Sequence, residues 1–270
     1  MNRGFITSVI LCGWILLSGT SVMGQLSRDP VHVDIHRWPT PEAQIAAAKR
    51  ILATLPRTAT PYERSVAIAT AAGELEMVFT TWPDNAEAGC EAALTESDIF
   101  ASAGLSRNAE QVLRQHEKTA RSTTQAARFY TRVAEIELRL GNVNDAIDAV
   151  TTAEGTPGFA AMRPGEKFRA LNTAASAFER SGRYEEAALR LRRLAGEGIL
   201  DEMTAADMMI RTLSNSTRMA DKTLARRDLA DLEGRFNALQ RKPSHTPAQD
   251  VVLRRLASAL QRYHTLLGAT

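Results

Sequence analysis

Gly-Asn-Val-Asn-Asp-Ala-Ile at residues 141–147 is matched 41 positions later by Gly-Arg-Tyr-Glu-Glu-Ala-Ala at residues 182–188. In both stretches an alanine follows the glycine by five residues, and a bulky apolar residue, Val150 or Leu191, follows that alanine by four. Glycine turns the chain without steric cost, and the small alanine lets a second helix approach the first closely. The two stretches therefore predict a repeated helical hairpin.

A third, looser copy of this pattern starts at Gly104, with Ala109 and Leu113 at the same spacings. The residues before each glycine also repeat, as small and large side chains at fixed offsets. These residues are Tyr130, Val133 and Ala134 in one copy, Leu171, Ala174 and Ala175 in the next, and more loosely Ala93, Glu96 and Ser97. The first helix of each hairpin is thus expected to repeat as well as the second.

Residues 127–153 and 168–194 resemble tetratricopeptide repeats (TPRs), which combine a large-small pair, a turn glycine, a small alanine and a bulky apolar residue in this order. One departure is Glu137, which stands where the other copies have Phe100 and Phe178. The glycines are 37 and 41 residues apart, against a family period of about 34. Extra residues are therefore expected between repeats, at 119–124 and 155–165.

The resemblance implies an all-α, TPR-like solenoid of helical hairpins, with N-terminal helices and a C-terminal capping helix. Composition independently favours helices, because only 6% of the 270 residues are aromatic and glycine and proline are few. Apolar residues recur with helical period from Ala43 onward, which predicts ten or eleven helices. We expect a signal peptide at 1–24, an extended leader at 25–42, the repeat domain at 43–242, and a linker with a capping helix at 243–270.

The N-terminus has the pattern of a secretory signal peptide. Arg3 precedes an apolar run from Phe5 to Leu17, and small residues lead to a predicted cleavage between Gly24 and Gln25. The protein is accordingly expected to be periplasmic or secreted, with an uncleaved membrane anchor as the alternative. Cys90 would then be the one remaining cysteine, which predicts a buried, unreactive thiol without an intrachain disulfide.

The leader contains three residues that could bind a metal ion. In an extended conformation His32, Asp34 and His36 would share one side of the chain, with apolar residues on the other. The alternative is an extended leader whose apolar side lies against the first helices, and this alternative is favoured. We predict no cofactor and no metal site, and no enzyme activity, because the sequence carries no phosphate loop, zinc motif or nucleophile elbow. Cys90 and His116 are the sole nucleophile-base pair that the sequence offers.

The TPR resemblance implies that the first helices of the hairpins form a binding groove. Its predicted residues are Arg128, Thr131, Glu135, Arg139, Arg169, Asn172, Ser176, Glu179 and Arg180. Planar guanidinium groups suit carboxylates, so an extended peptide with acidic side chains or a C-terminal carboxylate is the hypothesised ligand of Arg128, Arg139, Arg169 and Asn172. The alternative is an ordinary solvated polar face.

These features together predict a non-catalytic scaffold or adaptor that binds a protein or peptide partner in the cell envelope. The formal net charge of +2 supplies no field that would attract nucleic acid, and membrane contact is not favoured. Two alternatives remain open. One is a metal-binding protein or small enzyme that uses the leader cluster, and the other is a helical module that binds a cell-wall polymer.

Overall fold

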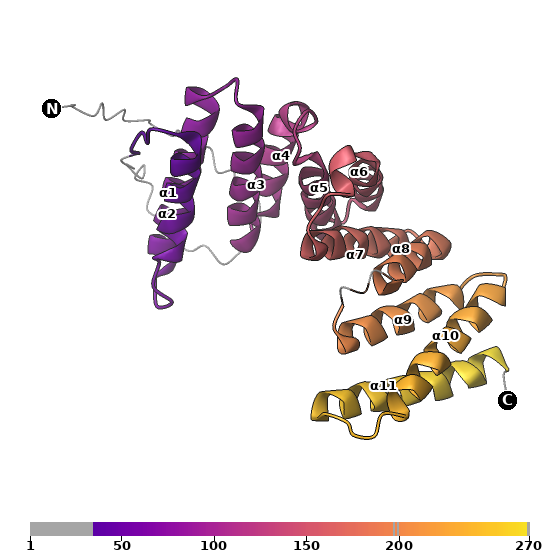
Figure 1. The fold of residues 1–270 in the computed structure, drawn as a ribbon. Helices are drawn as coiled ribbons and strands as arrows, with labels where there is room; N and C mark the ends of the chain where they lie inside the picture. Colours follow the sequence, from indigo (N-terminus) through magenta and orange to yellow (C-terminus); the bar gives the residue numbers. More distant parts are fainter. Residues whose placement is uncertain (1–34, 197, 199, 269–270) are drawn as a thin grey trace. The chain divides into compact units, whose positions relative to one another are not determined.

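The computed structural model describes residues 35–196, 198 and 200–268, and over these residues the chain forms helices and no strand (Figure 1). The prediction of an all-α fold with ten or eleven helices is confirmed within that part of the chain. The α-helices are α1 (Pro41–Ala53), α2 (Pro61–Thr81), α3 (Ala86–Ser102), α4 (Ser106–Ala120), α5 (Ala126–Leu140), α6 (Val143–Gly155), α7 (Pro164–Arg180), α8 (Tyr184–Gly196), α9 (Glu202–Ser216), α10 (Thr223–Gln240) and α11 (Pro247–Leu267).

The chain divides into two compact units, residues 1–129 and 130–270, with the boundary inside α5. The first unit contains α1 to α4 and the start of α5, and the second contains the rest of α5 and α6 to α11. The extra residues expected between repeats are found as turns at 121–125 and 156–163, the latter with a short 3-10 helix at Pro157–Phe159.

The three predicted turn glycines end α3, α5 and α7 in the same backbone geometry. Gly104, Gly141 and Gly182 have φ of 79°, 87° and 77°. In each turn the amide after the glycine donates to the carbonyl five residues before it, at 2.8 Å from Leu105 to Phe100, 2.9 Å from Asn142 to Glu137 and 2.8 Å from Arg183 to Phe178. This is the Schellman motif, which satisfies carbonyls left free at a helix end.

The side chains at these two bonded positions differ from turn to turn. The first turn has the apolar pair Phe100 and Leu105. In the second turn the Asn142 amide donates to the buried Glu137 carboxylate at 2.7 Å, and in the third the Arg183 guanidinium lies 4.6 Å from the centre of the Phe178 ring. The hydrogen bond explains how a carboxylate is tolerated where the other two repeats have phenylalanine.

In the first unit, the apolar core joins α1, α2 and α3. Its fully buried members include Ala48, Ala71, Leu75, Val78 and Ala92. Helix α2 begins with a capping box, in which Thr60 and Glu63 each bind the other's backbone amide. Cys90 is buried, as predicted, and burial raises the pKa of its thiol to about 11.

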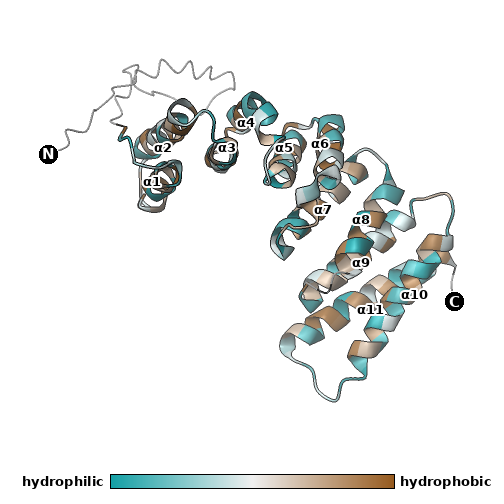
Figure 2. Ribbon diagram, turned by 45° about the horizontal axis from the view of Figure 1, so that its top comes forward, coloured by the Kyte–Doolittle hydropathy of each residue, from teal (hydrophilic) through white to brown (hydrophobic). Residues whose placement is uncertain are grey.

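In the second unit, one apolar cluster joins α5, α6, α7 and α8, and a second joins α9, α10 and α11. The alanines predicted at the hairpin contacts, Ala146 and Ala187, have no exposed surface. Helix α11 buries Val252, Leu256, Leu260 and Tyr263 against α9 and α10 while its arginines are exposed, and this division into apolar and polar faces is visible in Figure 2. None of the helices in the described part of the chain is apolar over a long enough stretch to span a membrane.

Candidate functional site

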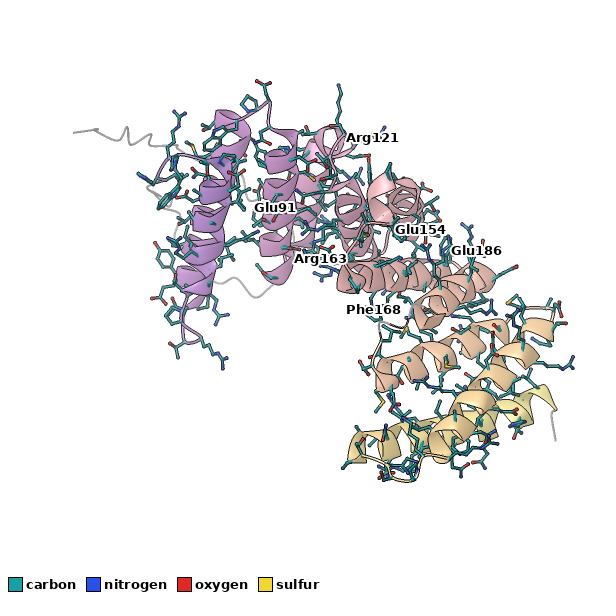
Figure 3. The ribbon with its side chains drawn as sticks, in the orientation of Figure 1. Glu91, Arg121, Glu154, Arg163, Phe168 and Glu186 are labelled. Atoms are coloured by element: carbon teal, nitrogen blue, oxygen red, sulfur yellow. The ribbon has the colours of Figure 1, made fainter. Side chains whose placement is uncertain are left out.

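Four ion pairs in the second unit connect first helices to first helices or second helices to second helices. On the first helices, Arg169 of α7 pairs with Glu135 of α5, and Arg211 of α9 pairs with Glu179 of α7. On the second helices, Arg190 of α8 pairs with Glu154 of α6 at 2.8 Å; Glu154 is labelled in Figure 3. Arg192 of α8 pairs with Asp228 of α10 at 2.7 Å. The hairpins are therefore stacked in two layers, as in a solenoid.

We call the layer formed by α5, α7 and α9 the first-helix face. Its polar residues are Glu135, Arg169, Asn172, Ser176, Glu179 and Arg211, and five of these six are residues that the sequence predicted for the groove.

Arg211 lies at the centre of the largest polar cluster on this face. Its guanidinium donates from Nε to Glu179 Oε1 at 2.8 Å, from Nη1 to Asn172 Oδ1 at 2.6 Å and from Nη2 to Ser176 Oγ at 2.9 Å. Asn215 also donates to Glu179 Oε1, at 2.7 Å. One arginine from α9 thus organises three of the predicted residues on α7.

Arg169 makes a two-pronged contact with Glu135, from Nε and Nη2 to the two carboxylate oxygens. Arg132, whose side chain is 7% exposed, donates to the same carboxylate at 2.9 Å. The Arg169 side chain is 52% exposed, so its guanidinium is both held in place by Glu135 and accessible to solvent. Two-pronged arginine-carboxylate pairs fix geometry more strongly than single contacts do.

The remaining predicted residues of the second unit have different environments. Thr131 is 4% exposed and offers little surface to a partner. Arg139 is exposed at the end of α5. Arg180 donates to the Leu138 carbonyl at 2.6 Å, where it caps the C-terminal end of α5 and its negative dipole end.

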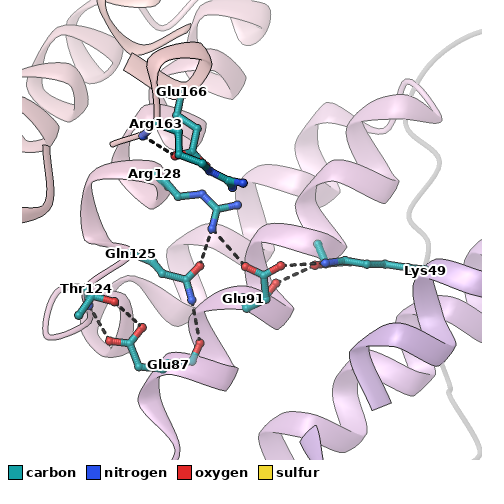
Figure 4. A network of polar contacts seen from close by, with 9 residues as sticks. Lys49, Glu87, Glu91, Thr124, Gln125, Arg128, Arg163 and Glu166 are labelled. Carbon is teal, nitrogen blue, oxygen red and sulfur yellow. Dashed lines mark hydrogen bonds and ion pairs between the residues drawn. The ribbon is translucent and has the colours of Figure 1, made fainter. Parts of the chain in front are cut away.

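In the first unit, Arg128 belongs to a smaller network on α1, α3 and the start of α5 (Figure 4). Its Nη1 donates to Gln125 at 2.9 Å and to Glu91 at 3.4 Å, and the other Glu91 oxygen accepts from Lys49 at 2.8 Å. Beside this network is a hollow of about 420 Å³, in which Leu52, Leu94 and Ile99 add apolar surface. The hollow combines apolar surface with charged groups, as peptide-binding grooves do.

Glu91 and Arg211 were not among the residues that the sequence predicted for the groove. Glu91 precedes its turn glycine by 13 residues, as do Arg128 and Arg169, so the same offset would have identified it. Arg211 had no such marker, because α9 is not followed by a turn glycine. The sequence of α9 therefore offered no register from which its groove residues could be identified.

The structure tests the metal hypothesis only in part. His32 and Asp34 lie outside the described residues, and within those residues no group of three histidine, cysteine or acidic side chains could hold a metal ion. His36 is described, and its backbone amide donates to Glu74 at 3.4 Å.

The candidate nucleophile-base pair consists of a buried thiol, Cys90, and an imidazole, His116, that stacks on an aromatic ring. The raised pKa of Cys90 keeps the thiol protonated at neutral pH, because burial disfavours the thiolate. The His116 ring stacks on Phe79 with 3.7 Å between ring centres, and burial lowers the pKa of this imidazole.

In comparisons with known proteins, this chain matches solved structures only. No protein-family model and no curated protein matches the chain. Two solved structures are similar to this chain. Both are of nearly identical TPR-like repeats of a kinesin light chain from Podosopora anserina, and one of the two carries a single-residue change. Each has a TM-score of 0.49 and 14% identity, and covers 76% of this chain and 100% of its own.

The fold assignment rests on the chain's own geometry. Three Schellman turns lie at the predicted glycines, the alanines at the hairpin contacts are buried, and polar pairs in the second unit join equivalent helices of successive hairpins. The chain has a TPR-like helical-repeat fold.

Proposed function

We propose that this protein is a non-catalytic scaffold or adaptor of the cell envelope, which binds a protein or peptide partner on its first-helix face. The proposal is based on two features of this face, the polar cluster around Arg211 and the Arg169–Glu135 pair. These groups are fixed by one another across three helices and remain partly exposed. Such preorganised polar groups can bind a ligand with little further loss of side-chain entropy.

The proposed ligand is an extended segment with acidic side chains or a C-terminal carboxylate. Arg169 is 52% exposed and shares its charge with Glu135 of this chain. A guanidinium has five N–H donors, which is more than one carboxylate accepts, so a partner carboxylate can join this pair. Asn172 and Arg139 lie on the same two helices as Arg169 and Glu135 and would contribute further polar contacts.

Export is the part of the proposal that rests on sequence alone. Residues 1–24 have the charged, apolar and small-residue segments of a signal peptide, and they lie outside the described residues. N-terminal sequencing of the protein isolated from its host tests this part, with Gln25 expected as the first residue. A mature chain that begins at Met1 would contradict cleavage.

Binding is tested by cross-linking the tagged chain in its own cell envelope and identifying what co-purifies after a high-salt wash. We expect one stoichiometric partner with the unchanged chain, and at least about a tenfold loss of it with Arg169→Glu. Arg114→Glu is the control, because this arginine lies on α4, a second helix, and its side chain is 61% exposed.

Folding must be excluded as the cause of any loss. Both variants should keep the helical circular dichroism spectrum and the melting temperature within a few degrees of the unchanged chain. Equal partner recovery with Arg169→Glu and the control would refute binding on the first-helix face.

A further inference from the structure

The hollow of about 420 Å³ beside the Glu91 network lies entirely within the first unit. Side chains of α1 and α3 line it, together with Arg128 at the start of α5. Its volume is in the range of pockets that bind small ligands. The polar groups of the first-helix face belong to the second unit, so the hollow shares no residue with the site proposed above.

One end of the hollow has more positive than negative charge. Lys49 and Arg128 share the carboxylate of Glu91, at 2.8 and 3.4 Å, so two cations are paired with one anion (Figure 4). The Lys49 side chain is 53% exposed, and its ammonium group has three N–H donors. Lys49 can therefore bind a carboxylate from outside the chain while it stays paired with Glu91.

The rest of the hollow has an apolar floor, which consists of Leu52 from α1 and of Leu94 and Ile99 from α3. Leu94 and Ile99 follow Glu91 by three and eight residues. Because a helix rises about 1.5 Å per residue, they lie about 4.5 and 12 Å further along α3. The middle of the apolar floor is therefore about 8 Å from the positive end.

Asp98 determines at which end of the hollow a carboxylate binds. It lines the hollow next to Ile99, away from Lys49, and its negative charge repels a carboxylate at that end. In an extended peptide, alternate side chains point to one side and are about 7 Å apart. The hollow thus matches a segment with an acidic and an aliphatic residue two positions apart.

We propose that the hollow of the first unit is a second binding site, which binds an extended segment of a partner protein. The segment places an acidic side chain against Lys49 and, two positions away, an aliphatic side chain on the apolar floor. A basic segment would instead meet the excess positive charge of Lys49 and Arg128. A wholly acidic segment would leave the apolar floor in water and place like charge next to Asp98.

Two variants with matched controls test this site in the full chain. Ser102 is exposed and lines the hollow, so Ser102→Trp fills it, whereas the exposed neighbour Ala103 does not line it and Ala103→Trp is the control. Lys49→Glu reverses the charge at the positive end, and Arg114→Glu makes the same change on α4, outside the hollow. All four positions are exposed, so each variant should keep the helical circular dichroism spectrum and the melting temperature within a few degrees.

The probe is a phage-displayed library of random decapeptides, which is selected against the unchanged chain. The most enriched peptides are then synthesised with capped ends and a fluorescent label, and their binding is measured by anisotropy. We expect enrichment of acidic and aliphatic residues two positions apart. These peptides should bind at least about tenfold more weakly to Ser102→Trp and to Lys49→Glu than to the matched controls.

The proposal would be overturned by a selection that enriches no peptide or peptides without this spacing, or by equal affinity for Ser102→Trp and Ala103→Trp. Arg169→Glu separates this site from the first-helix face, because Arg169 lies in the second unit. Peptides that lose affinity for Arg169→Glu and keep it for Ser102→Trp would bind the first-helix face and contradict a second site in the hollow.

Discussion

At the residue scale, the second turn depends on a glycine that no other residue replaces without strain. Gly141 has φ of 87°, and a Cβ atom built there would meet no atom within 4 Å. The cost of Gly141→Ala is therefore purely conformational, and we expect it to lower the free energy of unfolding by about 1–2 kcal/mol. Gly234, inside α10, also has open space around it but a helical conformation.

Gly234→Ala is the matched control and should raise the free energy of unfolding by about 0.5–1 kcal/mol, since alanine loses less backbone entropy than glycine in a helix. Urea unfolding followed by circular dichroism measures both. Effects of the same sign would show that the turn geometry is not the cause.

Glu96 gives the stability of the protein a dependence on pH. This residue of α3 is 8% exposed, and burial, with a smaller contribution from the nearby Glu76 charge, raises its pKa from 4.5 to about 8. Between these two values the folded chain keeps a proton that the unfolded chain releases. The free energy of unfolding therefore falls as pH rises from 4.5 to 8, by at most about 1.4 kcal/mol per pH unit from this group.

Replacing Glu96 with glutamine removes this titration. We expect Glu96→Gln to be more stable than the unchanged chain by about 1–3 kcal/mol at pH 8, with the difference shrinking toward pH 4.5. Glu76→Gln, at an exposed position, should change stability much less. Parallel pH profiles of the unchanged chain and Glu96→Gln in denaturant unfolding would contradict this account.

At the scale of secondary-structure elements, Asp228 connects three helices through one buried carboxylate. This residue of α10 is 5% exposed and accepts two hydrogen bonds from Arg192 of α8, at 2.8 and 2.7 Å, and one from Ser216 of α9. Asp228→Ala leaves the arginine without its partner and should lower the free energy of unfolding by about 3–5 kcal/mol.

A second ion pair provides the comparison for Asp228. Asp207 of α9 pairs with Arg255 of α11 at 2.7 Å, and both side chains are well exposed to solvent. Asp207→Ala should therefore lower the free energy of unfolding by less than about 1 kcal/mol. Similar losses for the two aspartates, measured by denaturant unfolding, would show that burial does not determine the strength of these pairs.

The elements themselves were predictable because their signals are local. Apolar periodicity marked the helices, and Gly104, Gly141 and Gly182 marked the turns that the structure places there. The polar contacts between elements were less predictable. Sequence reasoning placed Glu135 and Arg169 on one face, yet it did not pair them, because such pairing depends on the crossing of α5 and α7.

The segment just before α1 shows the same limit at longer range. The sequence predicted an extended leader whose apolar side lies against the first helices, and Ile35 of this leader is buried. Gln44 and Glu74 gave no signal, because a glutamine and a glutamate inside helical patterns are normally solvent-facing residues. Their role becomes visible only where the backbone of residues 36–38 meets both side chains.

At the scale of the whole molecule, many arginines of this helical repeat protein are paired with carboxylates of neighbouring hairpins. Such pairs hold the guanidinium groups of the first-helix face in fixed positions. The face would then select partners by the positions of their carboxylates more than by net charge. This is consistent with a formal net charge of only +2.

Site-specific photo-cross-linking in the native envelope tests the central claim most directly. A photoreactive amino acid replaces either Phe168, which is next to Arg169 on α7 and is not one of the proposed binding groups, or Leu189 on α8, which is 58% exposed. We expect a single cross-linked partner from position 168 and none from position 189, because binding uses the first-helix face. Equal cross-linking from both positions, or cross-linking from position 189 alone, would contradict the account.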